Sequence, residues 1–231
     1  MNGTLFFSAN NGTTGDELWR SDGTAAGTVL VKDIAPGASE SHPGFLTNVN
    51  GKLFFTADDG THGREPWKSD GTAAGTSLVK DIFPGVFGGW NPGNLTDVNG
   101  TLFFTANDDT NGQELWRSDG TTAGTVLVKD IFTGLGSSTP GNLTNVSGRL
   151  FFTASGVTGM SWLWQSDGTA AGTVLVTNLA PSSLTNVNGT LFFAADPEGT
   201  SASTNGLYSA PSNASTSSLL CRRPATAAAQ Q

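Results

Sequence analysis

Short apolar runs separated by turn-forming residues recur along the chain, and the stretch around residues 95–131 shows the pattern most completely. There the runs predict four strands, at residues 95–98, 101–106, 114–118 and 125–131. Each run is too short for a helix. Asn99-Gly100 lies between the first two strands and favours a type I′ turn, because both central residues of that turn need positive φ. Asp and Gly between Ser118 and Thr125 predict a second hairpin, which joins strands three and four.

The same pattern recurs five times. The triplet Leu-Phe-Phe is spaced by 48, 49, 48 and 41 residues and begins at Leu5, Leu53, Leu102, Leu150 and Leu191. A second marker, Trp-x-Ser-Asp-Gly-Thr, keeps step with it and begins at Trp19, Trp67, Trp116 and Trp164. Tyr208 takes the Trp position in a degraded fifth copy. The chain is therefore a tandem repeat, and we expect the repeated Trp side chains to lie in the core.

One four-strand meander cannot bury both of its faces alone, whereas stacked meanders cover one another. We therefore predict an all-β fold, a five-bladed β-propeller of four-stranded antiparallel blades. The repeat units cover approximately residues 1–44, 45–93, 94–141, 142–183 and 184–211. A linear β-solenoid is the alternative, but its coils are usually shorter, and the turns found here indicate hairpins.

Residues 17–28, Glu-Leu-Trp-Arg-Ser-Asp-Gly-Thr-Ala-Ala-Gly-Thr, recur with few changes from Glu65 to Thr76 and from Glu114 to Thr125. This motif resembles that of the ELWxxDGT-repeat proteins, a bacterial family of secreted or surface-associated chains, and the likeness extends over nearly all of residues 1–180. The fourth copy departs from it with Trp162 in place of Glu. The resemblance implies an extracellular or cell-surface location, and it supplies no catalytic residues.

The two ends fit the repeat less well. A strand precedes the Leu-Phe-Phe strand in four copies, but only Met1-Asn2-Gly3-Thr4 precedes the first one, so the first blade is expected to be incomplete. Three explanations stay open: a three-stranded blade, a closing strand from the C-terminal segment, or a chain cut from a longer array. Residues 212–231 form a non-repeat tail rich in Ser, Thr and Ala, in which 219–223 look like a remnant of cloning or of a frame shift. An exposed edge can recruit another chain, so we expect either a monomer or a strand-exchanged oligomer.

Composition narrows the classes of partner. The chain has 19 acidic and 11 basic residues, so its surface should repel phosphate backbones, and we expect no nucleic-acid partner. It lacks an apolar segment of membrane-spanning length and a signal peptide after Met1, so we expect a soluble chain without a membrane partner. Cys221 is the only cysteine, which excludes an internal disulfide. No cofactor is expected, and calcium is the one cation that we consider.

Successive connections in a meander alternate between two ends, so the strand two–three loops and the inter-blade loops share one rim. Sequence varies on this rim, and variable loops on a repeated scaffold are typical sites of binding. The candidate ligand-binding residues are Trp90, Asn91, His62, Asp58, Asp59, Asp108, Asp109 and His42. The four aspartates offer hard oxygen ligands, although neither pair completes a calcium loop. Trp90 has a flat apolar face on which a sugar ring could stack, but it could equally plug a channel or cap a blade.

The repeated acidic residues have a simpler interpretation. Glu17, Glu65 and Glu114 each precede the Trp by two positions, and we expect them to accept hydrogen bonds from backbone N–H groups of the next blade. Packing must repeat identically from blade to blade, whereas function rarely does. The same reasoning makes the Asp of each Ser-Asp-Gly-Thr turn structural.

Three functions remain after these observations. The leading hypothesis is a non-catalytic binding or adhesion module that recognises a glycan or another cell-surface ligand through the variable rim. The first alternative is a polysaccharide-active hydrolase or lyase that uses Asp58, Asp59, Asp108 or Asp109 as acid and base, which requires two carboxylates across a cleft. The second alternative is a structural spacer in a larger surface protein. His42 and His62 are the only histidines, and no nucleophile-elbow motif is present, so the sequence favours a protein that is not an enzyme.

Overall fold

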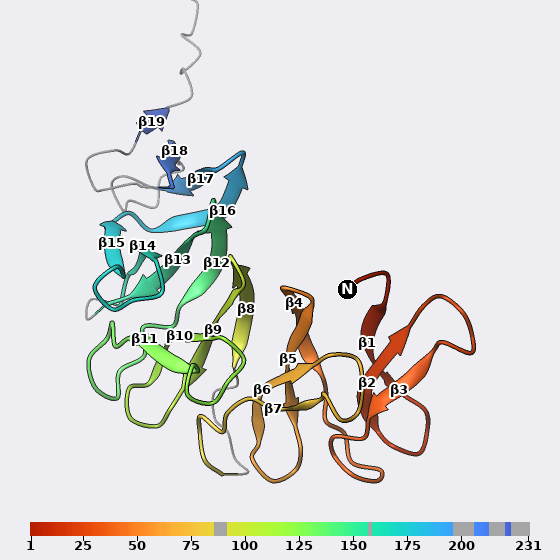
Figure 1. The fold of residues 1–231 in the computed structure, drawn as a ribbon. Coiled ribbons are helices and arrows are strands. Elements are labelled where there is room, and N and C mark those ends of the chain that lie inside the picture. Colours follow the sequence, from red (N-terminus) through yellow and green to blue (C-terminus); the bar gives the residue numbers. More distant parts are fainter. Residues whose placement is uncertain (86–91, 157–158, 196–205, 213–219, 223–231) are drawn as a thin grey trace, which may run out of the picture. The chain divides into compact units, whose positions relative to one another are not determined.

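The computed structural model describes residues 1–85, 92–156, 159–195, 206–212 and 220–222 (Figure 1). All regular elements in this part of the chain are strands, and they form five antiparallel sheets. The described residues include no helix that is long and apolar enough to cross a membrane. The prediction of an all-β fold is therefore confirmed. The chain divides into two compact units, Met1–Thr139 and Pro140–Gln231.

The first unit holds sheets 1 to 3, numbered here in chain order. Sheet 1 consists of β1 (Leu5–Asn10), β2 (Asp16–Ser21) and β3 (Val29–Lys32). Sheet 2 consists of β4 (Gly44–Val49), β5 (Lys52–Asp58), β6 (Arg64–Ser69) and β7 (Ser77–Leu78). Sheet 3 consists of β8 (Gly93–Val98), β9 (Thr101–Asn107), β10 (Gln113–Ser118) and β11 (Val126–Lys129).

The second unit holds sheets 4 and 5. Sheet 4 consists of β12 (Gly141–Val146), β13 (Arg149–Ser155), β14 (Ser161–Ser166) and β15 (Val174–Thr177). Sheet 5 consists of β16 (Pro181–Val187), β17 (Thr190–Ala195), β18 (Gly206–Pro211) and β19 (Leu220–Arg222). In each sheet the strands pair in the order of the sequence, as expected for a meander.

Turn chemistry places the strands where the sequence predicted them. Asn99 and Gly100 have φ of 51° and 81°, which is the positive φ that a type I′ turn needs, and the turn joins β8 to β9. The Asn2-Gly3 turn has the same geometry, with φ of 49° and 76°, and precedes β1. One predicted strand is too long, since β11 ends at Lys129 and not at residue 131. The N–H of Ile131 donates to Glu114, which takes the chain out of the strand ladder.

Apolar side chains hold neighbouring sheets together inside the first unit. Leu53, Phe55 and Trp67 of sheet 2 form one core with Leu18 and Val31 of sheet 1. The next junction repeats these contacts one sheet later, with Leu102, Phe104 and Trp116 of sheet 3 against Phe54 of sheet 2 and Val79, which follows β7. Trp67 and Trp116 are each 5% exposed, which confirms them as core residues, whereas Trp19 and Trp164 are only half-buried.

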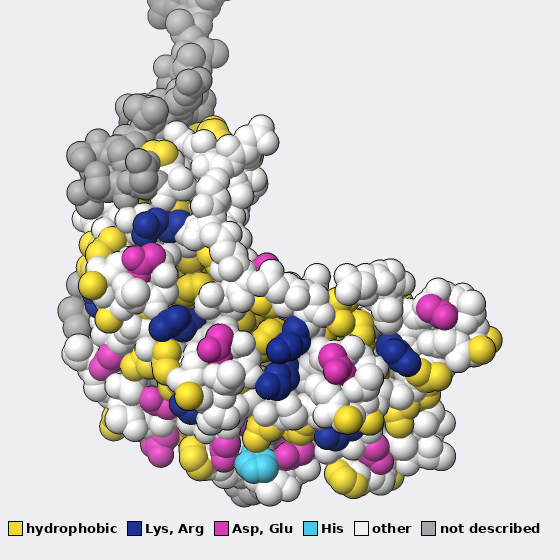
Figure 2. All heavy atoms as spheres, viewed as in Figure 1, with side chains coloured by type: hydrophobic (Ala, Val, Ile, Leu, Met, Phe, Trp, Pro, Cys, Tyr) yellow, Lys and Arg dark blue, Asp and Glu magenta, His cyan; other side chains and the backbone are white. Residues whose placement is uncertain are grey.

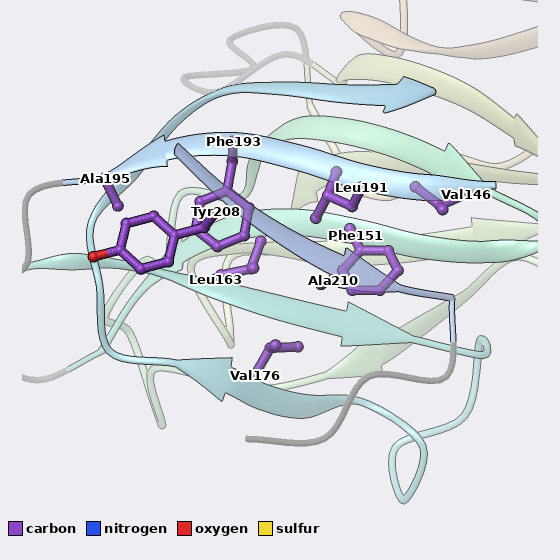
Figure 3. Close-up of a cluster of buried hydrophobic side chains, with 9 residues drawn as sticks. All are labelled: Val146, Phe151, Leu163, Val176, Leu191, Phe193, Ala195, Tyr208 and Ala210. Carbon is purple, nitrogen blue, oxygen red and sulfur yellow. The ribbon is translucent and has the colours of Figure 1, made fainter. Parts of the chain in front are cut away.

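The same kind of junction recurs in the second unit. Figure 3 shows side chains from sheets 4 and 5 that point toward one another. Leu191, Phe193 and Tyr208 of sheet 5 pack with Phe151 and Leu163 of sheet 4. The rings of Phe193 and Tyr208 are stacked with centroids 5.4 Å apart, so Tyr208 fills the Trp position of the repeat with a smaller ring.

The Ser-Asp-Gly-Thr hairpins are built from their own side chains. In sheet 3, Oδ1 of Asp119 accepts hydrogen bonds from the backbone N–H and the hydroxyl of Thr121, at 2.8 and 2.7 Å. A Cβ on Gly124 would lie about 2.2 Å from the Asp119 carboxylate, so this position excludes any side chain. Equivalent hydrogen bonds are made by Asp22, Asp70 and Asp167. The expected structural role of these aspartates is therefore what their contacts show.

The fourth strand of sheet 5 comes from the tail. Leu207, Tyr208 and Ser209 of β18 pair with Arg222, Cys221 and Leu220. The tail was one candidate for completing sheet 1, but this described strand pairs with β18, because the fifth repeat leaves that edge of β18 open. Sheet 1 has three strands among the described residues, as one of the sequence alternatives expected.

Candidate functional site

The predicted rim is built from two kinds of connection that contact each other. In the first unit these are the loops 11–15, 59–63 and 108–112 inside sheets 1 to 3, and the connections 33–43 and 130–139 that follow sheets 1 and 3. The N–H groups of Ser41 and His42 donate to the carbonyl of Asp16, and the N–H of Asp58 donates to the carbonyl of Ser41. The same contact recurs in sheet 3, where the N–H of Thr139 donates to the carbonyl of Gln113. We call this set of loops the rim.

The repeated glutamates clamp the connections of the rim. Glu17 is fully buried, and its carboxylate accepts the N–H groups of Ile34 and Ala35 and the hydroxyl of Ser41, at 2.9, 3.1 and 2.7 Å. Glu114 binds Ile131, Phe132 and both the N–H and the hydroxyl of Ser138. Backbone acceptance was predicted, but the donors lie in the connection that leads to the next sheet and not in that sheet itself. These glutamates stabilise the fold and are not exposed to a ligand.

Glu65 is the exception among these clamps. Its Oε1 accepts the N–H of Phe83 at 2.9 Å, but its buried Oε2 has no hydrogen-bond partner within the described residues. Burial raises the pKa of Glu65 to about 7, although hydrogen bonds from the backbone of Phe83 and Ile82 oppose this. The serine of the other two clamps is absent here. The position of that serine is taken by Gly89 when it is counted forward from the glutamate. It is taken by Trp90 when it is counted back from the Pro-Gly pair that follows.

The acidic loops of the rim are Asx turns of one recurring design. Oδ1 of Asp59 accepts the N–H groups of Thr61 and His62, both at 2.9 Å. Oδ1 of Asp108 accepts the N–H groups of Thr110 and Asn111 in the equivalent loop of sheet 3. Asn11 makes the same two contacts in sheet 1. Asp58 accepts the N–H of Gly60 at 2.7 Å. The acidic pairs singled out in the sequence therefore hold their own loops in shape.

Asp59 and His62 form an ion pair at the surface of sheet 2. Nδ1 of His62 lies 2.7 Å from Oδ2 of Asp59. This hydrogen bond raises the pKa of the His62 imidazole, and burial opposes it only in part. Burial also raises the pKa of Asp59, but the hydrogen bonds from His62 and Thr61 outweigh it and hold the pKa below its usual value. In sheet 3 the partner of Asp108 is the amide of Asn111, at 2.7 Å, so the charged pair is particular to the second repeat.

His42 meets two carboxylates on the rim of sheet 1. Its Nε2 lies 3.2 Å from Oε2 of Glu40, and its Nδ1 lies 3.7 Å from Oδ2 of Asp16. One ligand atom from each of the three residues lies within 4.8 Å of the others, so together they could ligate a divalent cation. The backbone is fixed here, because Arg64 donates to the carbonyl of His42 at 2.7 Å and His42 has a φ of 46°. About half of the imidazole remains exposed. In Figure 2 a histidine lies between acidic side chains at the lower edge of the view, below the strands of sheet 2 that are labelled in Figure 1.

The structure brings some of the predicted site residues together and leaves others apart. His42 is brought together with Glu40 and Asp16, and Asp58 lies next to them through its N–H contact with Ser41. Asp108 and Asp109 belong to the loop of another sheet, where Asp109 takes the positive φ that Gly60 has in sheet 2. Trp90 and Asn91 lie outside the described residues. Asp16 was missed, although Arg64, Gln113 and Ser161 hold the same position in the other repeats, and this departure could have revealed it.

Comparison with known proteins gives a likeness of fold. No protein-family model matches the chain, and no curated protein sequence matches it. Among solved structures, a puromycin hydrolase matches with a TM-score of 0.57 and 13% identity over 96% of this chain and 36% of its own. A solved structure from an analysis of two prolyl endopeptidases matches with a TM-score of 0.56 and 12% identity, over 96% of this chain and 34% of the matched chain. A puromycin-hydrolysing peptidase of Mycobacterium tuberculosis matches with a TM-score of 0.53 and 12% identity, over 95% and 35% of the two chains.

The chain spans about a third of the length of these solved structures. Together with the five antiparallel sheets, the matches support a propeller-like all-β fold. At this level of identity they carry no information about activity.

Proposed function

We propose that this protein is a non-catalytic extracellular binding module that recognises a glycan or another cell-surface ligand through the rim. Its scaffold would be a five-bladed propeller with a three-stranded first blade, for which the five meander sheets and the repeated junctions between them are the support. The extracellular location rests on the resemblance of the repeat to secreted bacterial chains.

One observation carries the binding proposal. Polar side chains that recur in three or four repeats are occupied by the scaffold, as the Glu clamps and the Asp turns show. Polar side chains found in only one repeat gather on the rim, namely Asp16, Glu40 and His42 beside sheet 1 and His62, the partner of Asp59, on sheet 2. A repeated scaffold with local departures on one rim is what a binding module needs.

The contacts of the rim aspartates favour binding over hydrolysis. A catalytic acid must stay free to give up or take a proton at the scissile bond. Asp59 and Asp108 each accept two backbone N–H groups of their own loop and a side-chain contact besides. Protonating either one would weaken the hydrogen bonds that hold its turn.

A glycan array tests the proposal. The wild-type chain, with and without added calcium, is compared with Trp90→Ala and with the near-isosteric Asp16→Asn/Glu40→Gln/His42→Asn variant. Lys52→Gln is the control, because Lys52 is exposed and lies at the opposite, hairpin end of β5. We expect retention of a sugar at millimolar concentration that Trp90→Ala and the triple variant both lose and the control keeps. Absence of any retained sugar, or release of reducing ends from a bound polysaccharide, would contradict the proposal.

A further inference from the structure

Three side chains of metal-ligating types meet on the rim beside sheet 1. Nε2 of His42 lies 3.2 Å from Oε2 of Glu40, and Nδ1 of the same ring lies 3.7 Å from Oδ2 of Asp16. One ligand atom from each residue lies within 4.8 Å of the other two. All three residues belong to the first unit, and the backbone segments that carry them are hydrogen-bonded to each other. The cluster is therefore formed within one unit.

The backbone beneath these side chains is held in one arrangement. The carbonyl of Asp16 accepts the N–H groups of Ser41 and His42, at 3.0 and 3.2 Å. Gly15 lets the connection 33–43 approach β2, because a Cβ on Gly15 would collide with the carbonyl oxygen of Ser39. Side chains that start from a fixed backbone and meet in one place are what a metal site requires.

Sheet 3 has the same backbone without these ligands. The residues at the three equivalent positions are Gln113, Ser137 and Thr139. The N–H of Thr139 donates to the carbonyl of Gln113, and the φ of Thr139 is 44°, close to the 46° of His42. The rim therefore folds in this way without a carboxylate or an imidazole at any of the three positions. The first repeat carries all three ligands there at once, which favours a role in binding over one in folding.

The donor set indicates the class of cation. Calcium takes six to eight oxygen ligands. One imidazole nitrogen with two carboxylate oxygens instead suits Zn²⁺ and related divalent transition metals. Two ligands that are each about 2.1 Å from a tetrahedral Zn²⁺ lie about 3.4 Å apart. Nε2 of His42 and Oε2 of Glu40 are already 3.2 Å apart, and rotation of the partly exposed Asp16 side chain would bring its carboxylate to the same ion.

We propose that Asp16, Glu40 and His42 bind a divalent transition-metal ion of the Zn²⁺ class. Three protein ligands leave at least one coordination position for water or for an oxygen of another ligand. The three side chains are 39% to 54% exposed, so the ion has a path to the site and its open position faces solvent. This site does not depend on the recognition of a glycan, because its evidence and its test concern the ion alone.

Isothermal titration calorimetry with Zn²⁺, in the absence of any sugar, tests the site. The wild-type chain should bind one ion, and more tightly than it binds Ca²⁺. Three variants, Asp16→Gln, Glu40→Ser and His42→Thr, each install the residue that the same backbone carries in sheet 3, so they should fold. Each should weaken Zn²⁺ binding by at least about tenfold, because losing even a residue that only supports a ligand costs about tenfold to a hundredfold in affinity.

Asp97→Asn is the matched control. It also replaces a carboxylate with the residue of other repeats, and Asn48 and Asn145 make the same hydrogen bond to the glycine of the hairpin turn. Asp97→Asn should bind Zn²⁺ like the wild type. The imidazole proton resonances provide a second measurement: those of His42 should shift as Zn²⁺ is added. Those of His62 should stay, since no third ligand joins the His62–Asp59 pair among the described residues.

The outcomes that would overturn the proposal are equally specific. They are a wild type without saturable Zn²⁺ binding, tighter binding of Ca²⁺ than of Zn²⁺, or a His42→Thr variant that is folded and binds Zn²⁺ as the wild type does. A shift of the His62 resonances without one of His42 would also overturn it. Circular dichroism shows whether each variant is folded, and the resonances of the wild type decide the question without any variant.

Discussion

The buried carboxyl of Glu65 gives the most quantitative prediction. Its pKa is raised from 4.5 to about 7, mainly because burial disfavours the charged form. In the unfolded chain Glu65 ionises near its ordinary value, so between these two pH values the folded state binds more protons than the unfolded one. Its contribution to stability is therefore complete below about pH 4.5, falls as the pH rises, and is lost above about pH 7. The full difference corresponds to about 3 kcal/mol.

Glu65→Gln removes the charge and keeps the shape of the side chain. Its carbonyl oxygen can still accept the N–H of Phe83. We expect the free energy of unfolding of this variant, relative to the wild type, to rise by about 2–3 kcal/mol between about pH 5 and pH 8. Urea unfolding at a series of pH values measures it. The raised pKa of His62 also makes stability fall as the pH rises, so both chains are compared again in a His62→Asn background.

Glu17→Gln is the control, and we expect it to lower the free energy of unfolding instead of raising it. Glu17 accepts three donors, and an amide nitrogen facing the N–H of Ile34 or Ala35 would break a charge-assisted hydrogen bond. This variant should lose about 1.5–3 kcal/mol at pH 8. A Glu65→Gln effect that does not change with pH, or a carboxyl carbon resonance that titrates near pH 4.5, would refute the reasoning.

Three further predictions use the same unfolding assay. Gly120→Ala should destabilise by about 1–3 kcal/mol, because Gly120 has a φ of 90° and a Cβ there would lie 3.0 Å from Phe54; Gly23→Ala, with a φ of 92° and open space, should cost less. Lys80→Met should cost about 1 kcal/mol, through loss of the contact with the Trp116 ring and of the hydrogen bond to the carbonyl of Thr125, and equal stability would contradict that role. His62→Asn copies the Asp108–Asn111 pair, so it should be less stable than the wild type at pH 5, and this deficit should shrink as the pH rises, because the raised pKa of His62 stabilises the fold only while the imidazole is protonated; a loss that does not change with pH would show that the imidazole has a packing role.

The sequence predicted the strands well because their ends depend on local chemistry. The Asn-Gly turns need positive φ, and the Asp of each hairpin binds the Thr two residues on, so the information lies within a few residues. The predicted burial of the repeat tryptophans holds for some of them only. Trp67 and Trp116 are buried by a preceding sheet, whereas the half-buried Trp19 and Trp164 have none in their own units. A motif that is identical in each copy contains no trace of that difference.

The candidate site was harder to predict because it depends on contacts between distant segments. Asp16 is separated from Glu40 and His42 by two strands and a connection, and the clamp of Glu17 on Ile34, Ala35 and Ser41 brings them together. The sequence identified His42 as a candidate, but it could not show that Asp58, Asp59 and Asp108 would be engaged by their own loops. An isolated acidic pair looks the same whether its oxygens face solvent or backbone.

Departures from a repeat are the strongest functional evidence that such a chain offers, because identical residues in every copy perform the same structural task. The connection after sheet 2 combines two departures. It lacks the serine that satisfies the clamps of Glu17 and Glu114, and its sequence gains Trp90 near that position. Glu65 is left with a buried oxygen that has no partner among the described residues, which costs stability above neutral pH. Selection for binding would leave this pattern, in which a stabilising contact is lost at the place where an aromatic residue is gained. Trp90→Ala should therefore reduce ligand retention without restoring the ordinary pKa of Glu65.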